Sequence, residues 1–188
     1  MKYLIVGLGN VGAEYANTRH NIGFVVLDAL AGSLKDVNFS LDRHAYVAKA
    51  KFRARTLVLI KPSTYMNLSG KAVKYWLNKE NIPIENLLVV VDDIALPLGI
   101  LRMKARGGDG GHNGLNNIIF QLVSEAFPRL RIGIGDDFAR GHQVGYVLSQ
   151  WTRTEETLMI PRVEAAVAAI KSFVTIGIER TMNEVNSM

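Results

Sequence analysis

KYLIVGLGNVG, residues 2–12, is an apolar run that ends in three closely spaced glycines. This is the pattern of a buried β-strand followed by a tight turn. The glycines match the G-x-G-x-x-G spacing of a dinucleotide-binding turn, after which a helix packed on the sheet should begin. The residues that follow are instead polar: EYANTRHN at 14–21 carries an imidazole, a guanidinium and two amides. We therefore predict that this turn presents Asn10 and His20 for a chemical reaction and does not bind a nicotinamide cofactor.

Outward from this turn, strand and helix patterns alternate along the chain. Short β-branched runs predict strands at 2–7, 47–51, 56–60, 87–91, 100–104 and 130–134. Apolar residues at helical spacing predict helices at 22–34, 71–78, 115–123 and 163–178. Ser69 is the expected N-cap of the second helix, and Pro161 either starts the last helix or kinks a longer one.

This alternation predicts an α/β fold with a central twisted, mostly parallel mixed β-sheet flanked by helices. No linker, repeat or low-complexity tract divides the chain. We therefore expect residues 1–188 to form a single domain, because this length is within the usual range for one hydrophobic core.

Composition excludes several classes of protein. Hydrophobic residues make up 48% of the chain and charged residues 21%, which is not the composition of a disordered protein. The net charge of +5 has two interpretations, a solvated surface or a polyanionic partner such as nucleic acid, and charge alone does not choose between them. The absence of cysteine excludes disulfides, a thiol nucleophile and thiolate zinc sites. With no signal-peptide pattern and no long apolar run, we expect a soluble cytoplasmic protein and no membrane partner.

Polar groups gather at positions where strands give way to turns or helices. Four such motifs carry an asparagine each, at Asn10, Asn21, Asn67 and Asn113, and Asp92-Asp93 ends the very apolar run LLVVV at 87–91. The carboxyl ends of parallel strands meet at one edge of an open sheet, where α/β proteins bind their ligands. We therefore expect these side chains to converge.

A pair formed by His20 and Asp92 would suit general base catalysis. The imidazole accepts a proton from water, while the carboxylate fixes its tautomer and stabilises the imidazolium, a contribution of about 10²–10⁴-fold. No Gly-x-Ser-x-Gly motif is present, so water is the expected nucleophile. A shared Mg²⁺ on Asp92 and Asp93 is disfavoured because adjacent strand residues point to opposite faces. His112, flanked by glycines, is interpreted as holding its own loop.

Taken together, the motifs resemble the bacterial peptidyl-tRNA hydrolase family. GLGNVG at 7–12 with Tyr15 and TRHNIG at 18–23 resembles the family's first signature. The family's further motifs follow in order as YMNLSG at 65–70, VDD at 91–93, GGHNGL at 110–115 and RLRIGIG at 129–135. The resemblance covers the chain from its first residues to about residue 148.

The resemblance implies an esterase that cleaves the bond between a peptide and the 3′ ribose of tRNA, recycling the tRNA. It implies that His20 is the general base, that Asp92 stabilises its protonated form, and that Asn10 distinguishes peptidyl-tRNA from aminoacyl-tRNA. The implied contacts with the tRNA are made by Tyr15, Tyr65, Asn67, Asn113, Lys104 and Arg131, the last two as a clamp on phosphates. It also implies a monomer that needs neither cofactor nor metal.

The chain departs from the family at three positions: Val11 replaces a usual proline, Ala95 an acidic residue of some members, and Arg106 a glycine. None of these is the predicted base or its partner.

Two other functions remain as alternatives. A non-catalytic RNA-binding relative on the same scaffold would share the basic charge, but it has no need of His20, Asp92 and Asn10. A dinucleotide-dependent oxidoreductase requires an acidic residue at the end of a second strand. Asp28 is near the required distance but lies within an apolar helical pattern.

Overall fold

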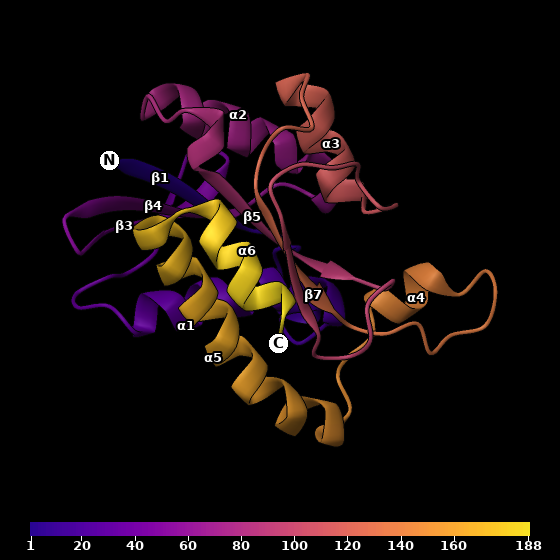
Figure 1. Ribbon diagram of the computed structural model, residues 1–188. Coiled ribbons are helices and arrows are strands. Elements are labelled where there is room, and N and C mark those ends of the chain that lie inside the picture. Colours follow the sequence, from indigo (N-terminus) through magenta and orange to yellow (C-terminus); the bar gives the residue numbers. More distant parts are fainter.

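The computed structural model describes all residues from 1 to 188 and contains one seven-stranded sheet (Figure 1). Its strand order is β2-β3-β4-β1-β5-β7-β6. The strands are β1 (Lys2–Gly7), β2 (Ser40–Asp42), β3 (Ala45–Phe52), β4 (Arg55–Pro62), β5 (Leu87–Asp93), β6 (Leu101–Lys104) and β7 (Arg129–Gly133). The helices are α1 (Ile22–Gly32), α2 (Ser69–Lys79), α3 (Asn113–Leu122), α4 (Gln143–Val147), α5 (Arg153–Ile176) and α6 (Ile178–Asn186).

The four central strands, β4, β1, β5 and β7, run parallel, and the outer strands pair antiparallel to them or to each other. The predicted α/β fold with a mixed sheet flanked by helices is confirmed. Parallel pairing places the carboxyl ends of β1, β4 and β5 at one edge, which is where the predicted site residues follow them in the chain.

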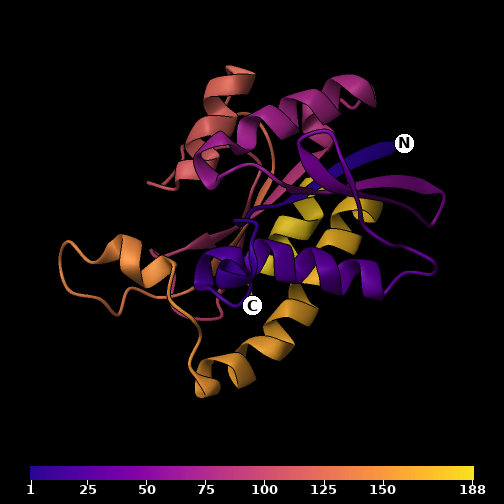
Figure 2. The same cartoon turned by 180° about the vertical axis from the view of Figure 1, so that it is seen from behind.

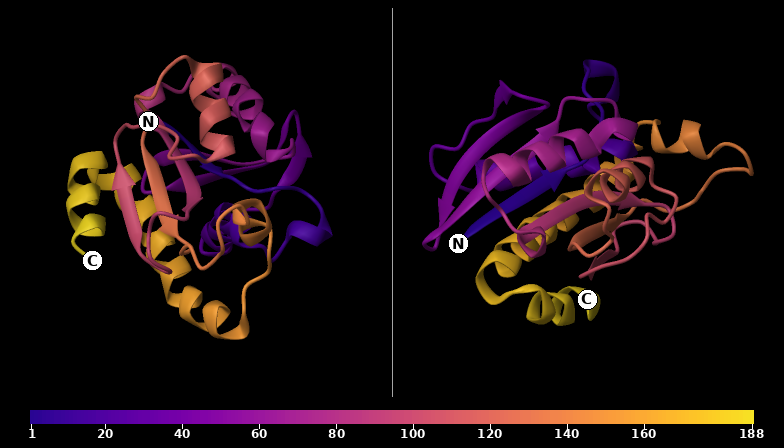
Figure 3. Two further views of the ribbon diagram at one scale, coloured as in Figure 1. Left: turned by 90° about the vertical axis from the view of Figure 1, so that its right-hand side faces the viewer. Right: turned by 90° about the horizontal axis from the view of Figure 1, so that it is seen from above.

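Helices cover both faces of the sheet, as Figures 1 and 2 show from opposite sides. Helices α2 and α3 lie on one face, while α1, α5 and α6 lie on the other, and the two further views in Figure 3 separate these layers. Along β1 the side chains alternate between the layers: Tyr3 and Ile5 join the core under α1 and α5, while Leu4 and Val6 join the core under α2. A strand buried on both faces is apolar throughout, which explains the opening run.

Two glycines bring α1 against the end of β1. A Cβ on Gly7 would lie 2.2 Å from the carbonyl oxygen of Gly23, and a Cβ on Gly23 would lie 2.5 Å from the amide nitrogen of Leu8. The glycine at the end of the strand therefore serves close packing between strand and helix, which explains its presence without a bound dinucleotide.

Several element boundaries differ from the predictions. Ser69 lies inside α2 and its hydroxyl donates to the carbonyl of Met66, so the prediction that it is an N-cap was wrong. Pro161 lies inside α5, which begins earlier, at a capping box formed by Thr152 and Glu155. The predicted final helix is interrupted at Gly177, whose φ of 88° ends α5 before α6 begins. None of the helices has the length and apolar character needed to cross a bilayer.

Candidate active site

A cleft of about 720 Å³ opens at the carboxyl edge of the central strands. All nine residues that the sequence singled out as site residues line it. They are Asn10, Tyr15, His20, Tyr65, Asn67, Asp92, Lys104, Asn113 and Arg131. The cleft also has a wall that the sequence did not predict, formed by Gln143, Val144 and Val147 of α4 together with Leu148.

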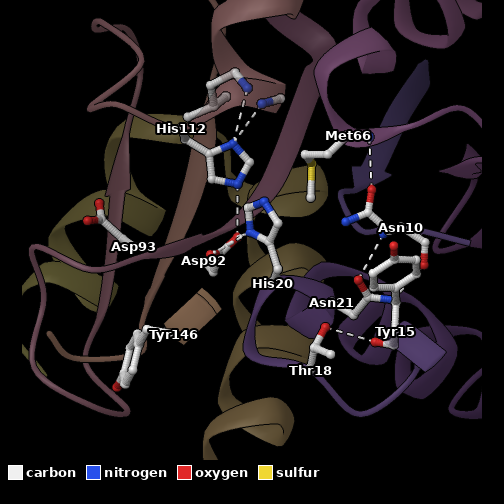
Figure 4. A network of polar contacts seen from close by, with 12 residues as sticks. Asn10, Tyr15, Thr18, His20, Asn21, Met66, Asp92, Asp93, His112 and Tyr146 are labelled. Atoms are coloured by element: carbon white, nitrogen blue, oxygen red, sulfur yellow. Dashed lines mark hydrogen bonds and ion pairs between the residues drawn. The ribbon is translucent and has the colours of Figure 1, made fainter. Parts of the chain in front are cut away.

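Three side chains form a hydrogen-bonded group at the base of this cleft (Figure 4). Nδ1 of His20 lies 2.8 and 2.9 Å from the two carboxylate oxygens of Asp92. Nε2 of His112 lies 2.8 Å from Oδ1 of the same carboxylate. Asp92 is only 4% exposed, at the end of β5, so this carboxylate is shared by two imidazoles in a buried position.

The hydrogen bonds fix where the protons of these imidazoles lie. Nδ1 of His112 accepts from the backbone amides of Gly114 and Leu115, at the N-terminus of α3, so the ring proton is on Nε2 and is donated to Asp92. His20 donates its Nδ1 proton to the same carboxylate, which leaves Nε2 of His20 as the acceptor nitrogen. This is the tautomer that a general base requires.

The charge of Asp92 is maintained by its partners. Burial by itself would raise the pKa of this carboxyl group, but His112 and His20 outweigh burial and hold the pKa well below its usual range. Asp92 is therefore an anion at neutral pH, available to stabilise a protonated imidazole at His20.

His20, Asp92 and His112 are also residue types that bind metal ions, and their ligand atoms lie within 4.8 Å of one another. The hydrogen bonds oppose that use. A metal ion on Nε2 of His112 would displace the proton there while Nδ1 is already an acceptor for two amides, which would require an imidazolate or the loss of the cap on α3. The arrangement suits proton transfer better than metal coordination.

Asn10 is held in place through hydrogen bonds of both its backbone and its side chain. Its amide nitrogen donates to Oδ1 of Asn21 and its carbonyl accepts from Nδ2 of Asn21, both at 2.8 Å. Oδ1 of Asn10 accepts from the backbone amide of Met66 at 2.9 Å. Since the side-chain oxygen is occupied, the NH₂ group of Asn10 is the donor that remains available to a ligand.

Asp93 points away from Asp92, as the alternation of a strand predicts (Figure 4). Its carboxylate accepts from Nε of Arg131 at 2.7 Å, and Arg131 remains partly exposed in the cleft wall. Lys104, at the end of β6, is exposed in the cleft and pairs in register with Arg129, two residues before Arg131 on the same face of β7. The two cations that the resemblance assigned to phosphates therefore lie on the same side of the cleft as Asp93.

Comparison with known proteins identifies the family of this chain. The sequence profile described as peptidyl-tRNA hydrolase matches residues 4–188. The chain belongs to this family.

A peptidyl-tRNA hydrolase from Cytophaga hutchinsonii is 56% identical over 187 residues, covering 100% of this chain and 99% of the relative. One from Phocaeicola vulgatus is 55% identical over 99% of both chains. The crystal structure of peptidyl-tRNA hydrolase from Acinetobacter baumannii superimposes with a TM-score of 0.92 at 35% identity, covering 98% of this chain and 94% of the other.

The sequence indicated only one of the two contacts that His112 makes. The interpretation that it holds its own loop is half right, because Nδ1 caps α3. The other nitrogen binds Asp92, which the sequence did not indicate. The available signal was its position directly before the apolar run of α3, where an N-cap residue is expected to use its side chain.

A second missed feature is the anchor of the loop that carries His20. Arg19 is 6% exposed, donates to the carbonyl of Gln150 at 3.0 Å and to Glu155 at 2.6 Å, and lies with its guanidinium carbon 4.4 Å from the centre of the Tyr146 ring. The backbone amide of Arg19 also donates to the carbonyl of Ser149. These partners lie about 130 residues further along the chain, so no local pattern could indicate them.

Proposed function

We propose that this protein hydrolyses the ester bond between the peptide and the tRNA of peptidyl-tRNA. One observation carries the proposal: Asp92 accepts an N–H from both His20 and His112, which leaves Nε2 of His20 free to accept a proton at the wall of a cleft. Membership of the peptidyl-tRNA hydrolase family supplies the substrate class.

In the reaction, a water molecule held by Nε2 of His20 gives its proton to that nitrogen as its oxygen attacks the ester carbonyl carbon. Asp92 stabilises the imidazolium that results. When the tetrahedral intermediate collapses, the bond to the ribose 3′ oxygen breaks and this oxygen takes the proton from Nε2. The products are a peptide carboxylic acid and tRNA with a free 3′ hydroxyl, and His20 returns to its initial state.

We assign binding of the substrate to the remaining cleft residues. The free NH₂ group of Asn10 suits an acceptor on the peptide, which an aminoacyl-tRNA without a peptide amide would lack. Tyr65 is 72% exposed at the rim, and its ring can stack on a base or ribose. The other proposed contacts with the acceptor end of tRNA are made by Tyr15, Asn67 and Asn113. Lys104 and Arg131 are the proposed clamp on tRNA phosphates, and give the net charge of +5 a location.

The decisive experiment compares release of tRNA from N-blocked and unblocked aminoacyl-tRNA. We expect hydrolysis of the blocked ester only. His20→Ala should abolish turnover and leave tRNA binding unchanged, while His142→Ala, an exposed histidine outside the cleft, should leave both unchanged. Near-normal turnover of His20→Ala would contradict the assignment of the base. Binding of tRNA by wild-type protein without any turnover would favour the non-catalytic alternative, which no observation otherwise favours.

The phosphate clamp has its own test. Lys104→Ala and Arg131→Ala should raise KM with little change in kcat, and each should reduce the slope of log kcat/KM against log salt by about 1. Arg180→Ala, on the exposed side of α6, is the control and should leave the slope unchanged. Equal slopes in all proteins would contradict the clamp.

We further propose that the protein acts in the cytoplasm as a monomer and without a metal ion. The protonation of His112 supports the last point, because its cleft-facing nitrogen is a donor. Sedimentation should give the mass of one chain, and a chelator should leave turnover unchanged.

A further inference from the structure

A second hollow of about 230 Å³ adjoins the catalytic cleft on the far side of Asn10. Asn10 lines both spaces and therefore lies between them. The other walls of the hollow come from the turn after β1, from the outer side of α1, and from β3 and β4. Five of its ten lining residues are apolar or aromatic, among them Ala16, Phe24 and Tyr46, and its polar side chains are those of Asn10, Asn21, Asp28 and Lys61.

The polar groups in the walls of this hollow already have partners: the side chain of Asn21 binds the backbone of Asn10, and the one cation is neutralised. Lys61 pairs with Asp28 at 2.5 Å, and its amine lies 4.3 Å from the centre of the Phe39 ring. Tyr46 is 37% exposed at the rim. A hollow of this kind suits an apolar side chain better than a phosphate or a carboxylate.

The position of the hollow relative to His20 indicates which part of the substrate lies near it. In Figure 4, Asn10 and Asp93 lie on opposite sides of His20. Arg131 pairs with Asp93, so the proposed clamp on the tRNA phosphates lies on the side of His20 away from Asn10. With the ester at His20, the tRNA phosphates extend toward Arg131, and the peptide extends toward Asn10, whose NH₂ group is the proposed contact with the peptide.

We propose that this hollow is a subsite for the penultimate residue of the peptide, with a preference for an apolar side chain. The inference rests on the proposed function. If Asn10 contacts the amide that joins the last residue to the one before it, the penultimate residue is the first part of the peptide beyond Asn10. The hollow begins at that point, and its apolar residues set the preference.

The test uses three substrates that carry the same tRNA and the same esterified alanine: N-acetyl-alanyl-tRNA, N-acetyl-glycyl-alanyl-tRNA and N-acetyl-leucyl-alanyl-tRNA. For the wild-type protein we expect kcat/KM to be about tenfold higher with leucine than with glycine at the penultimate position, since filling an apolar pocket gives discrimination of this order.

Two variants then remove the hollow in opposite ways. Tyr46→Ala opens its rim, and Ala16→Trp fills it from an exposed position in the turn. Both should reduce the leucine-to-glycine ratio to near 1 while kcat/KM for N-acetyl-alanyl-tRNA stays unchanged. Phe120→Ala, which removes an aromatic ring that is 74% exposed and lines neither space, is the matched control and should keep the wild-type ratio.

The outcomes separate this inference from the proposed function. Cleavage of all three substrates by the wild type at equal efficiency would overturn the subsite alone. A wild-type ratio that persists in both variants would also overturn it, as would an equal loss on all three substrates. Failure of the wild type to cleave any of the three would overturn the proposed function and the subsite with it.

Discussion

At the scale of single residues, the site depends on the different surroundings of two adjacent carboxylates. Asp92 is buried and accepts two imidazole N–H groups, whereas Asp93 faces the other way and pairs with Arg131. The alternation of side chains along β5 sends one carboxylate to the proposed base and the other to the proposed phosphate clamp. One strand end therefore serves both catalysis and binding.

The same substitution at these two positions should have different effects. Asp92→Asn removes a negative charge and presents an amide to two N–H donors, so we expect kcat to fall by about 10²–10⁴-fold, as when a base loses the carboxylate that orients it. Asp93→Asn should keep kcat within about twofold and alter KM, because the side chain binds Arg131 and the backbone amide of Ala95 and does not contact the proposed base. Steady-state kinetics with a blocked aminoacyl-tRNA measure both. A similar fall in kcat for the two variants would contradict the division of roles.

Single residues also show what the sequence could predict about the site. His20 and Asp92 were predictable because each ends a recognisable motif at the same edge of the sheet. The contact of His112 with Asp92 was not predictable from spacing, because a glycine-rich loop, whose path no periodic pattern indicates, separates β6 from α3. Arg19 could be placed only by the tertiary structure, which brings Gln150 and Glu155 to it.

At the scale of elements, burial explains which strands and helices the sequence predicted. β1 and β5 are buried on both faces and gave strong apolar runs. β2 has three exposed residues and α4 has no buried residue, so neither produced a hydrophobic pattern. The apolar spacing predicts the last helix only from residue 163 and leaves open whether Pro161 starts it or lies within a longer helix; α5 continues on both sides of Pro161, which is the second alternative.

The start of α3 offers a test that separates two roles of His112. His112→Ala removes both the cap on α3 and the donor to Asp92, whereas His112→Asn restores a capping side chain without reaching Asp92 in the same way. We expect the alanine variant to be less stable than the asparagine variant by about 1 kcal/mol, the usual contribution of an N-cap. Urea unfolding measures this difference. Equal stability of the two variants would show that the cap contributes nothing.

The anchor between the His20 loop and the start of α5 offers a second test. Arg19→Met leaves the partly buried carboxylate of Glu155 without its cation, so we expect a loss of about 3 kcal/mol, the lower end for a buried pair, and a fall in kcat, since His20 is the next residue. Glu155→Met should be similarly costly because it also removes the capping box. The double variant should lose less than the sum of the two, as measured by chemical unfolding. Strict additivity would contradict the pairing.

At the scale of the whole molecule, one sheet supports two separate cores, and the cleft lies at the edge where both end. The core under α1 and α5 fixes the loop that carries His20, and the core under α2 and α3 positions His112 and Met66. The distances between His20, Asp92 and His112 therefore depend on how both helical layers pack against β5, which carries Asp92 between them.

We propose that the whole chain is a single domain and unfolds as one unit, and its two tryptophans allow this to be tested. Trp76 lies in the core under α2, and Trp151 packs against the core under α1 and α5. Trp76→Phe and Trp151→Phe each leave one fluorophore, on opposite faces of the sheet. Because β1 and β5 contribute side chains to both cores, neither face can lose its packing alone, and we expect each variant's fluorescence transition in urea to coincide with its own far-UV circular dichroism transition. Fluorescence that changes before circular dichroism in either variant would show instead that one layer unfolds separately.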